Sequence, residues 1–164
     1  MSLNLHSLIG LPLTDDRIPT PAFVLDKAKL LANIHRAQKC AADLGVAFRP
    51  HLKTHKSIDI ARLQMTSPEG PATVSTLAEA RYFAENGVKD ILYAVGIAPQ
   101  KLAEVDAIRH ETGCDLKIIL DSAEAAKLVS DFCRAHHTTL PVLLEIDVDG
   151  HRSGLLPDSP DIVT

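Results

Sequence analysis

The stretch RPHLKTHKS, residues 49–57, gathers positive charge in a chain whose net charge is −4. Arg49, His51, Lys53, His55 and Lys56 stand there without an acidic neighbour. Nearby cations disfavour an ammonium ion, so they favour the free amine of Lys53, which can form a Schiff base with a carbonyl compound. Judged on charge alone, however, a lysine among cations more often binds an anion or is simply solvated.

A second charged stretch, VLLEIDVDG at residues 142–150, carries acidic residues at every second position. Glu145, Asp147 and Asp149 alternate with apolar residues, as Arg49, His51, Lys53 and His55 do in their own stretch. Side chains alternate between the two faces of a strand, so each stretch predicts one charged face. Four further residues extend this polar lining if their alternation has the same sense: Thr73, Ser75, Lys117 and Asp121.

These charged faces constrain the architecture. In an open sheet with helices on both sides, each unpaired ion would be buried at a cost of several kcal/mol. In a barrel, they point into the interior, where the basic and the acidic strand can form ion pairs. The alternative is that residues near the strand ends, His55 and Asp149 above all, are solvated.

The elements that position these residues follow a strand–helix alternation. Short apolar strands are separated by helical segments of about ten to fifteen residues, which predicts an α/β fold with a mainly parallel sheet. Thr76 and Glu79 have the spacing of a helix capping box. Alternation alone leaves an open sheet and a barrel as alternatives. We expect barrel strands at residues 47–53, 72–75, 90–96, 116–121 and 141–149.

Composition excludes several classes of function. With 46% hydrophobic residues and no apolar run of about 18 or more, the chain predicts a globular protein without a membrane span. A net charge of −4 gives no sign of nucleic acid binding. The three cysteines are scattered, which favours reduced thiols and a cytoplasmic location. No glycine-rich dinucleotide or nucleotide motif is present.

Three motifs together resemble a known family. TPAFVLD, RPHLKTHKS and EIDVDGHRSG, in this order, resemble the N-terminal part of the fold-type-III pyridoxal-phosphate enzymes, which have the alanine-racemase-type barrel. The K-T-H-K variant is similar to the branch of D-threonine aldolase, 3-hydroxy-D-aspartate aldolase and D-serine dehydratase. The resemblance runs from about Pro19 to Gly154 and implies a partial (β/α)8 TIM barrel with about five barrel strands.

The resemblance also implies roles for individual residues. Lys53 matches the catalytic lysine that holds pyridoxal 5′-phosphate as a Schiff base and later moves protons at the substrate. His51 matches a position close to the cofactor, and Arg152 matches the arginine of the family's R-x-G motif. From spacing alone, Arg152 would be a solvated loop residue. The implied substrates are D-amino or β-hydroxy amino acids; racemase, aldolase and dehydratase chemistry remain open.

The domain organisation expected from the resemblance is incomplete. Residues 1–20 form an N-terminal lead, residues 21–26 a strand of a missing β-domain, and residues 27–164 the N-terminal part of the barrel. A barrel of this type closes with eight strands, so we expect a fragment with little activity alone. No metal ligands are expected within this chain; a divalent metal and a homodimer belong to the full-length form. Alternatives are a non-catalytic pyridoxal-phosphate-binding barrel protein and an anion- or carboxylate-binding α/β module.

Overall fold

The computed structural model describes residues 5–163 and divides the chain into two compact units, Met1–Ala37 and Gln38–Thr164. The first unit contains the 3₁₀ helix η1 (Leu5–Leu8), an irregular segment and the first part of helix α1 (Lys27–Asp43), which continues into the second unit. Residues 21–26 form no strand in this structure, and their pairing with a β-domain stays a prediction. A β-strand needs a neighbour to hydrogen-bond with, and this segment makes no backbone ladder within the described part of the chain.

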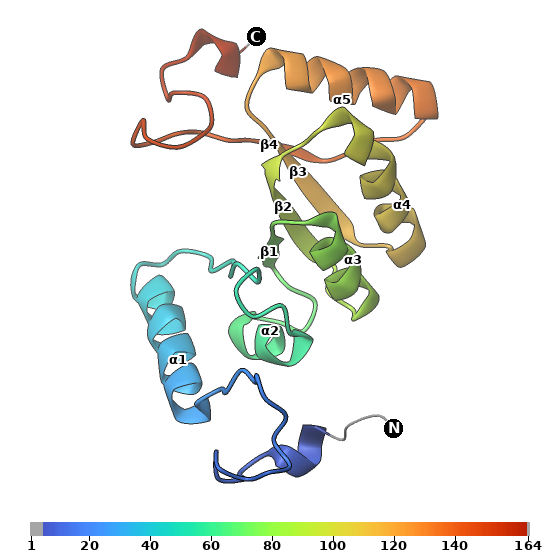
Figure 1. The fold of residues 1–164 in the computed structure, drawn as a ribbon. Coiled ribbons are helices and arrows are strands. Elements are labelled where there is room, and N and C mark those ends of the chain that lie inside the picture. The colour runs from blue at the N-terminus through green and yellow to red at the C-terminus, as the bar shows by residue number, and fades with distance from the viewer. Residues whose placement is uncertain (1–4, 164) are drawn as a thin grey trace. The chain divides into compact units, whose positions relative to one another are not determined.

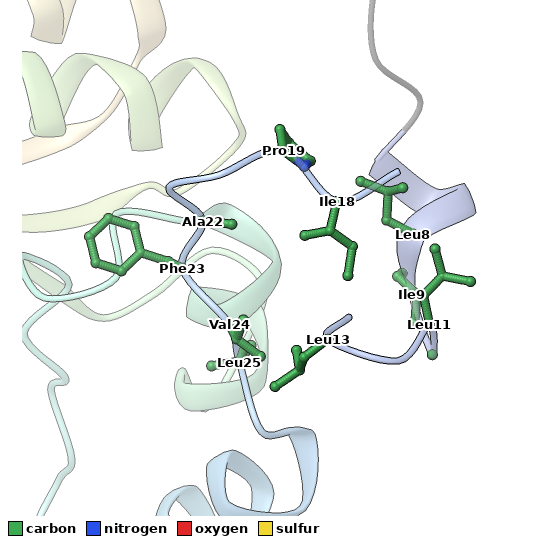
Figure 2. Close-up of a pocket in the computed structure, with 11 residues that line it drawn as sticks. Leu8, Ile9, Leu11, Leu13, Ile18, Pro19, Ala22, Phe23, Val24 and Leu25 are labelled. Atoms are coloured by element: carbon green, nitrogen blue, oxygen red, sulfur yellow. The ribbon is translucent and has the colours of Figure 1, made fainter. Parts of the chain in front are cut away.

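Within the first unit, apolar side chains surround a hollow of about 490 Å³ (Figure 2). Leu8, Leu13 and Ile18 lie around it, whereas the ring of Phe23 points away and is fully exposed. Among the described residues, those that line this hollow carry no ionisable side chain.

The second unit is built on a four-stranded parallel sheet in the order β1-β2-β3-β4. The strands are β1 (Ala72–Val74), β2 (Asp90–Gly96), β3 (Asp115–Leu120) and β4 (Val142–Leu144). The α-helices are α2 (Ile58–Gln64), α3 (Leu77–Glu85), α4 (Leu102–Thr112) and α5 (Ala123–His136), and the 3₁₀ helices are η2 (Pro99–Lys101) and η3 (Pro160–Ile162). Each strand lies beside the next one in sequence with a helix between them (Figure 1), which is the repeating unit of a (β/α) barrel.

Of the five predicted strands, the one at residues 47–53 is not formed and the one at residues 141–149 is shortened. Residues 47–53 make only a parallel bridge from His51 to Thr73, in which Leu52 N–H donates to the Thr73 carbonyl at 2.8 Å. Pro50 has no N–H to donate, which limits the ladder on this segment. The predicted strand 141–149 narrows to β4, beyond which the chain turns back and Ile146 pairs with Leu155.

The two faces of the sheet differ as the alternation predicts. One face packs under the helices and is fully buried, with Val74, Ile91, Tyr93, Leu116 and Ile118 in contact with the core. Burial of each such side chain stabilises the fold by about 1.5–3 kcal/mol. On the other face, strand register aligns one row: His51, Thr73, Leu92 and Lys117. The chain is therefore a partial barrel with an apolar outer and a largely polar inner face.

Local signals determine where the helices begin and end. The Thr76 hydroxyl accepts the Glu79 N–H at 3.1 Å, so the predicted capping interaction at the start of α3 is confirmed. Ser122 caps α5 in the same way, by accepting the Ala125 N–H. Gly113 ends α4 in the left-handed conformation at φ 64°, which glycine adopts without a steric cost.

Candidate functional site

A pocket of about 350 Å³ lies at the carboxyl ends of the strands. Lys53 enters it just after the bridge at His51, and Glu145 enters it just after β4. The lining residues are His51, Lys53, Ala94, Glu145, Ile146, Asp147, Val148, Asp149, Arg152 and Ser153. In barrels of this kind, the carboxyl ends of the strands carry the active site. The fold thus brings the two charged stretches, nearly a hundred residues apart in sequence, to one site.

Lys53 is exposed at this pocket. Its backbone N–H donates to Nδ1 of His51 at 3.3 Å, which ties the position of the lysine backbone to the imidazole. Within residues 5–163, no carboxylate lies within ion-pair distance of its ammonium group. Its side chain is therefore available to a ligand.

His51 has contacts on both ring nitrogens. Because Nδ1 accepts from Lys53, the neutral ring carries its proton on Nε2 and can donate it to the Ser75 hydroxyl, 3.2 Å away. Burial lowers the pKa of His51, and the positive charge of Lys53 lowers it further, while the negative charge of Glu79 acts in the opposite direction. His51 is therefore neutral at pH 7 and adds no positive charge beside Lys53.

The acidic stretch organises the loop that carries Arg152. Asp147 accepts the Arg152 N–H at 3.0 Å and the Gly150 N–H at 3.1 Å, and Glu145 accepts the Ser153 hydroxyl at 3.0 Å. These N–H donors, first that of Arg152, lower the pKa of Asp147. At Gly154, a Cβ would lie 2.6 Å from the Glu145 carbonyl oxygen, so only glycine fits there.

The expected ion pairing between the basic and acidic strands is not formed. The carboxylates of Glu145 and Asp147 bind their own loop, which the sequence prediction missed. For Asp147, its place in D-V-D-G-H-R-S was the available signal, since aspartates shortly before a glycine often accept N–H groups from the following turn. Arg152 itself is exposed and lines the pocket.

Arg49 lies at the opposite end of the inner face. Its guanidinium donates to both carboxylate oxygens of Asp90, at 3.0 and 2.7 Å, and Lys117 donates to Asp90 at 2.8 Å. Burial alone would raise the pKa of Asp90, but these two cations lower it overall. Asp90 thus neutralises basic residues of the inner face, a role that the sequence prediction did not assign.

His55 does not share the face of His51 and Lys53, so that prediction is wrong. The chain leaves the extended conformation after Leu52 and turns, and His55 Nε2 lies 2.8 Å from the side-chain oxygen of Gln64 on α2. The Ser57 N–H donates to the other ring nitrogen of His55 at 3.0 Å. His55 therefore fastens the turn after Lys53 to α2.

Within residues 5–163, no group of three or more His, Cys, Asp or Glu side chains is placed to hold a metal ion. Among the same residues, none of the helices combines the length and apolar character needed to cross a bilayer.

With this geometry in place, comparison defines the class of protein. Residues 25–163 match the family described as alanine racemase, N-terminal domain, and the chain belongs to this family. The resemblance predicted from the three motifs is confirmed, as is the alanine-racemase-type α/β fold. Enzymes of this family type use pyridoxal phosphate, which agrees with a pocket that presents a lysine amine.

The particular relatives narrow the branch. D-threo-3-hydroxyaspartate dehydratase from Delftia sp. (strain HT23) is 42% identical over 146 residues, which cover 89% of this chain and 38% of that protein. D-serine dehydratase from Schizosaccharomyces pombe is 32% identical, with coverages of 89% and 37%. D-threonine aldolase from Arthrobacter sp. is 31% identical, with coverages of 87% and 38%.

Solved structures with a similar fold belong to the same group of proteins. An Ala racemase-like protein from Idiomarina loihiensis superposes with a TM-score of 0.82 at 42% identity, over 87% of this chain and 38% of that one. The Delftia dehydratase superposes with a TM-score of 0.81 at 44% identity, over 86% and 37%. The chain spans less than two fifths of the length of these relatives.

Proposed function

We propose that this chain supplies the lysine-bearing part of a pyridoxal-phosphate-dependent lyase that acts on D-amino or β-hydroxy amino acids. One observation carries the proposal: Lys53, His51 and Arg152 line a single pocket at the carboxyl ends of the strands. The relatives named above are dehydratases and an aldolase. The higher identity to the Delftia dehydratase favours loss of a β-substituent over aldol cleavage.

Each residue has a distinct task in this proposal. The Lys53 amine would hold the cofactor through its carbonyl carbon and would move a proton at the substrate Cα. Neutral His51 lies beside the site without repelling a protonated substrate amine. Arg152 offers a guanidinium to an anionic oxygen of the cofactor or to the substrate carboxylate. When bound, pyridoxal phosphate supplies an electron sink for the electrons released at Cα.

The pocket fits this cofactor in chemistry and in size. Its volume of about 350 Å³ falls within the range of small-molecule sites. Lys53 places its side-chain nitrogen at this pocket, and Arg152 adds a positive charge to the same lining. Because the inner face is open on one side, we infer that the chain alone binds the cofactor weakly and turns over little.

Further features of the longer form follow from the same proposal. We infer that residues 21–26 pair with a β-domain, that a divalent metal belongs to the longer form only, and that this form is a homodimer acting on a small amino acid. The predicted cytoplasmic location likewise remains a prediction.

The test is a titration of the 164-residue chain with pyridoxal phosphate. We expect weak absorbance growth at roughly 410 to 430 nm, as for a lysine imine. Borohydride reduction followed by peptide mapping should place the label on Lys53. Lys53→Ala should remove the band, whereas Lys127→Ala, an exposed lysine on α5, should retain it.

Four outcomes would contradict the proposal or part of it. No absorbance change would favour the anion-binding module. A label spread evenly over surface lysines would deny Lys53 a special role. Full turnover by this chain alone would overturn the expectation of low activity. An unreduced Lys53 imine that no amino acid displaces would favour a non-catalytic carrier.

A further inference from the structure

Glu79 is a buried carboxylate close to the Lys53 site, and the proposed chemistry gives it no task. It lies in the first turn of α3, and only 7% of its surface is exposed. One carboxylate oxygen accepts the Ser75 N–H at 2.9 Å. The other lies 3.2 Å from the ammonium of Lys56, in the turn that follows Lys53.

Both contacts lead to the pocket. On one side, the Ser75 hydroxyl lies 3.2 Å from Nε2 of His51, and Nδ1 of His51 accepts the Lys53 N–H at 3.3 Å. On the other side, Lys56 adopts a positive φ of 51°, and its N–H donates to the Leu52 carbonyl at 3.0 Å. Glu79 thus contacts both Ser75, the residue that follows β1 and faces His51, and Lys56 in the turn after Lys53.

The charge of Glu79 is part of this arrangement. Burial alone would raise the pKa of Glu79, but the Ser75 N–H and the Lys56 ammonium outweigh burial and lower it. The ionised carboxylate acts on His51 against burial and the charge of Lys53. The other charged groups that share the pocket with His51 are Glu145, Asp147, Asp149 and Arg152.

We propose that Glu79 is a positioning residue for the Lys53 site, which fixes Ser75 and the turn after Lys53 so that the amine and the imidazole face the pocket in one arrangement. Its relevance to catalysis rests on the proposed function. A helix cap alone would require only an acceptor for the Ser75 N–H, which a glutamine also provides. The reach of Glu79 to Lys56 is the additional feature that a cap does not need.

The experiment compares Glu79→Gln with Glu85→Gln in the 164-residue chain. The glutamine can still accept the Ser75 N–H, but it loses the negative charge that faces Lys56 and His51. Glu85 lies on the same helix, is exposed and pairs only loosely with Arg81, so its variant is the matched control. The first readout is the His51 imidazole titration by NMR without cofactor. The second is the rate at which pyridoxal phosphate and borohydride label Lys53, with Lys127 as an internal reference.

We expect Glu79→Gln to lower the pKa of His51 and to slow Lys53 labelling at least about threefold, because a displaced nucleophile reacts more slowly. Lys127 labelling and the Glu85→Gln variant should match the unaltered chain. Lys56→Gln removes the ion pair on an exposed residue, so it keeps the test available if Glu79→Gln does not fold, and it should also slow Lys53 labelling.

Unchanged His51 titration and unchanged Lys53 labelling in Glu79→Gln would overturn the positioning role, and unchanged labelling in Lys56→Gln would do the same. The proposed function fails separately. If Lys53 of the unaltered chain is labelled no faster than Lys127, the cofactor assignment is wrong, while the His51 titration still decides the role of Glu79.

Discussion

Asp90 explains how this sheet tolerates a basic inner face, and its removal is the most informative test of that face. Asp90 begins β2 and receives two hydrogen bonds from Arg49, at 2.7 and 3.0 Å, and one from Lys117, at 2.8 Å. Asp90→Asn keeps the size of the side chain but removes its charge. The substitution leaves Arg49 and Lys117 facing each other across the strand without their shared counter-ion.

The expected loss can be worked from these contacts. Hydrogen bonds to charged groups contribute about 1.5–3 kcal/mol each when well buried, while exposed ion pairs contribute about 0.2–1 kcal/mol. The Asp90 side chain is 39% exposed, so solvent screening places its contacts towards the lower range. We therefore expect Asp90→Asn to lower the free energy of unfolding by about 1–2 kcal/mol at pH 7.

Urea denaturation at several pH values tests both the size and the origin of this effect. The pKa of Asp90 is lowered in the folded state, so its stabilisation is present above the unfolded pKa of about 3.9 and is lost as the pH falls through the folded value. The difference between Asp90→Asn and the unaltered chain should narrow below about pH 4.

A matched control separates strand-to-strand pairing from general charge effects. Asp131 also pairs with two basic residues, but all three side chains lie on one helix, α5. Asp131→Asn should cost less than Asp90→Asn. If the two variants lose equal stability, or if the loss at Asp90 is the same at pH 7 and pH 3, then Asp90 does not stabilise the inner face through its charge.

Two further predictions concern the core. Phe83→Ala should lower the free energy of unfolding by about 3–5 kcal/mol in urea, because Phe83 is fully buried; Leu63→Ala, at a residue that is 47% exposed, should cost much less, and equal losses would contradict the assigned core. Burial raises the pKa of the Cys114 thiol to about 11, so a thiol reagent at pH 8 should modify exposed Cys40 first and reach Cys114 only when urea unfolds the chain. Equal native rates would show that Cys114 is accessible.

Much of the sheet was predictable from alternation. Ile91 and Tyr93 point to the helices, as do Leu116 and Ile118, because a strand with one helix-covered face needs apolar residues at every second position. The cap at Thr76 was predictable for a similar reason, since it depends on neighbours three residues apart.

Other features were not predictable from the chain read in order. His55 continues the alternation of Arg49, His51 and Lys53, yet it packs against α2 because the chain turns after Leu52. Residues 21–26 have a strand-like composition, but composition supplies no hydrogen-bonding partner. The ion pairs of Asp90 were not predictable because its partners, Arg49 and Lys117, lie on two other segments of the chain, far from Asp90 in sequence.

The sequence by itself determined which residues are charged and which residues of β1, β2 and β3 form the apolar face, because these properties depend on residue type and a period of two. Only the tertiary structure decided which charges meet. The fold of the sheet places the Asp90 carboxylate between the side chains of Arg49 and Lys117. The packing of α3 places the Glu79 carboxylate beside the ammonium group of Lys56. The loop after β4 brings Arg152 to the pocket of Lys53 because Glu145 and Asp147 bind that loop and not the basic strand.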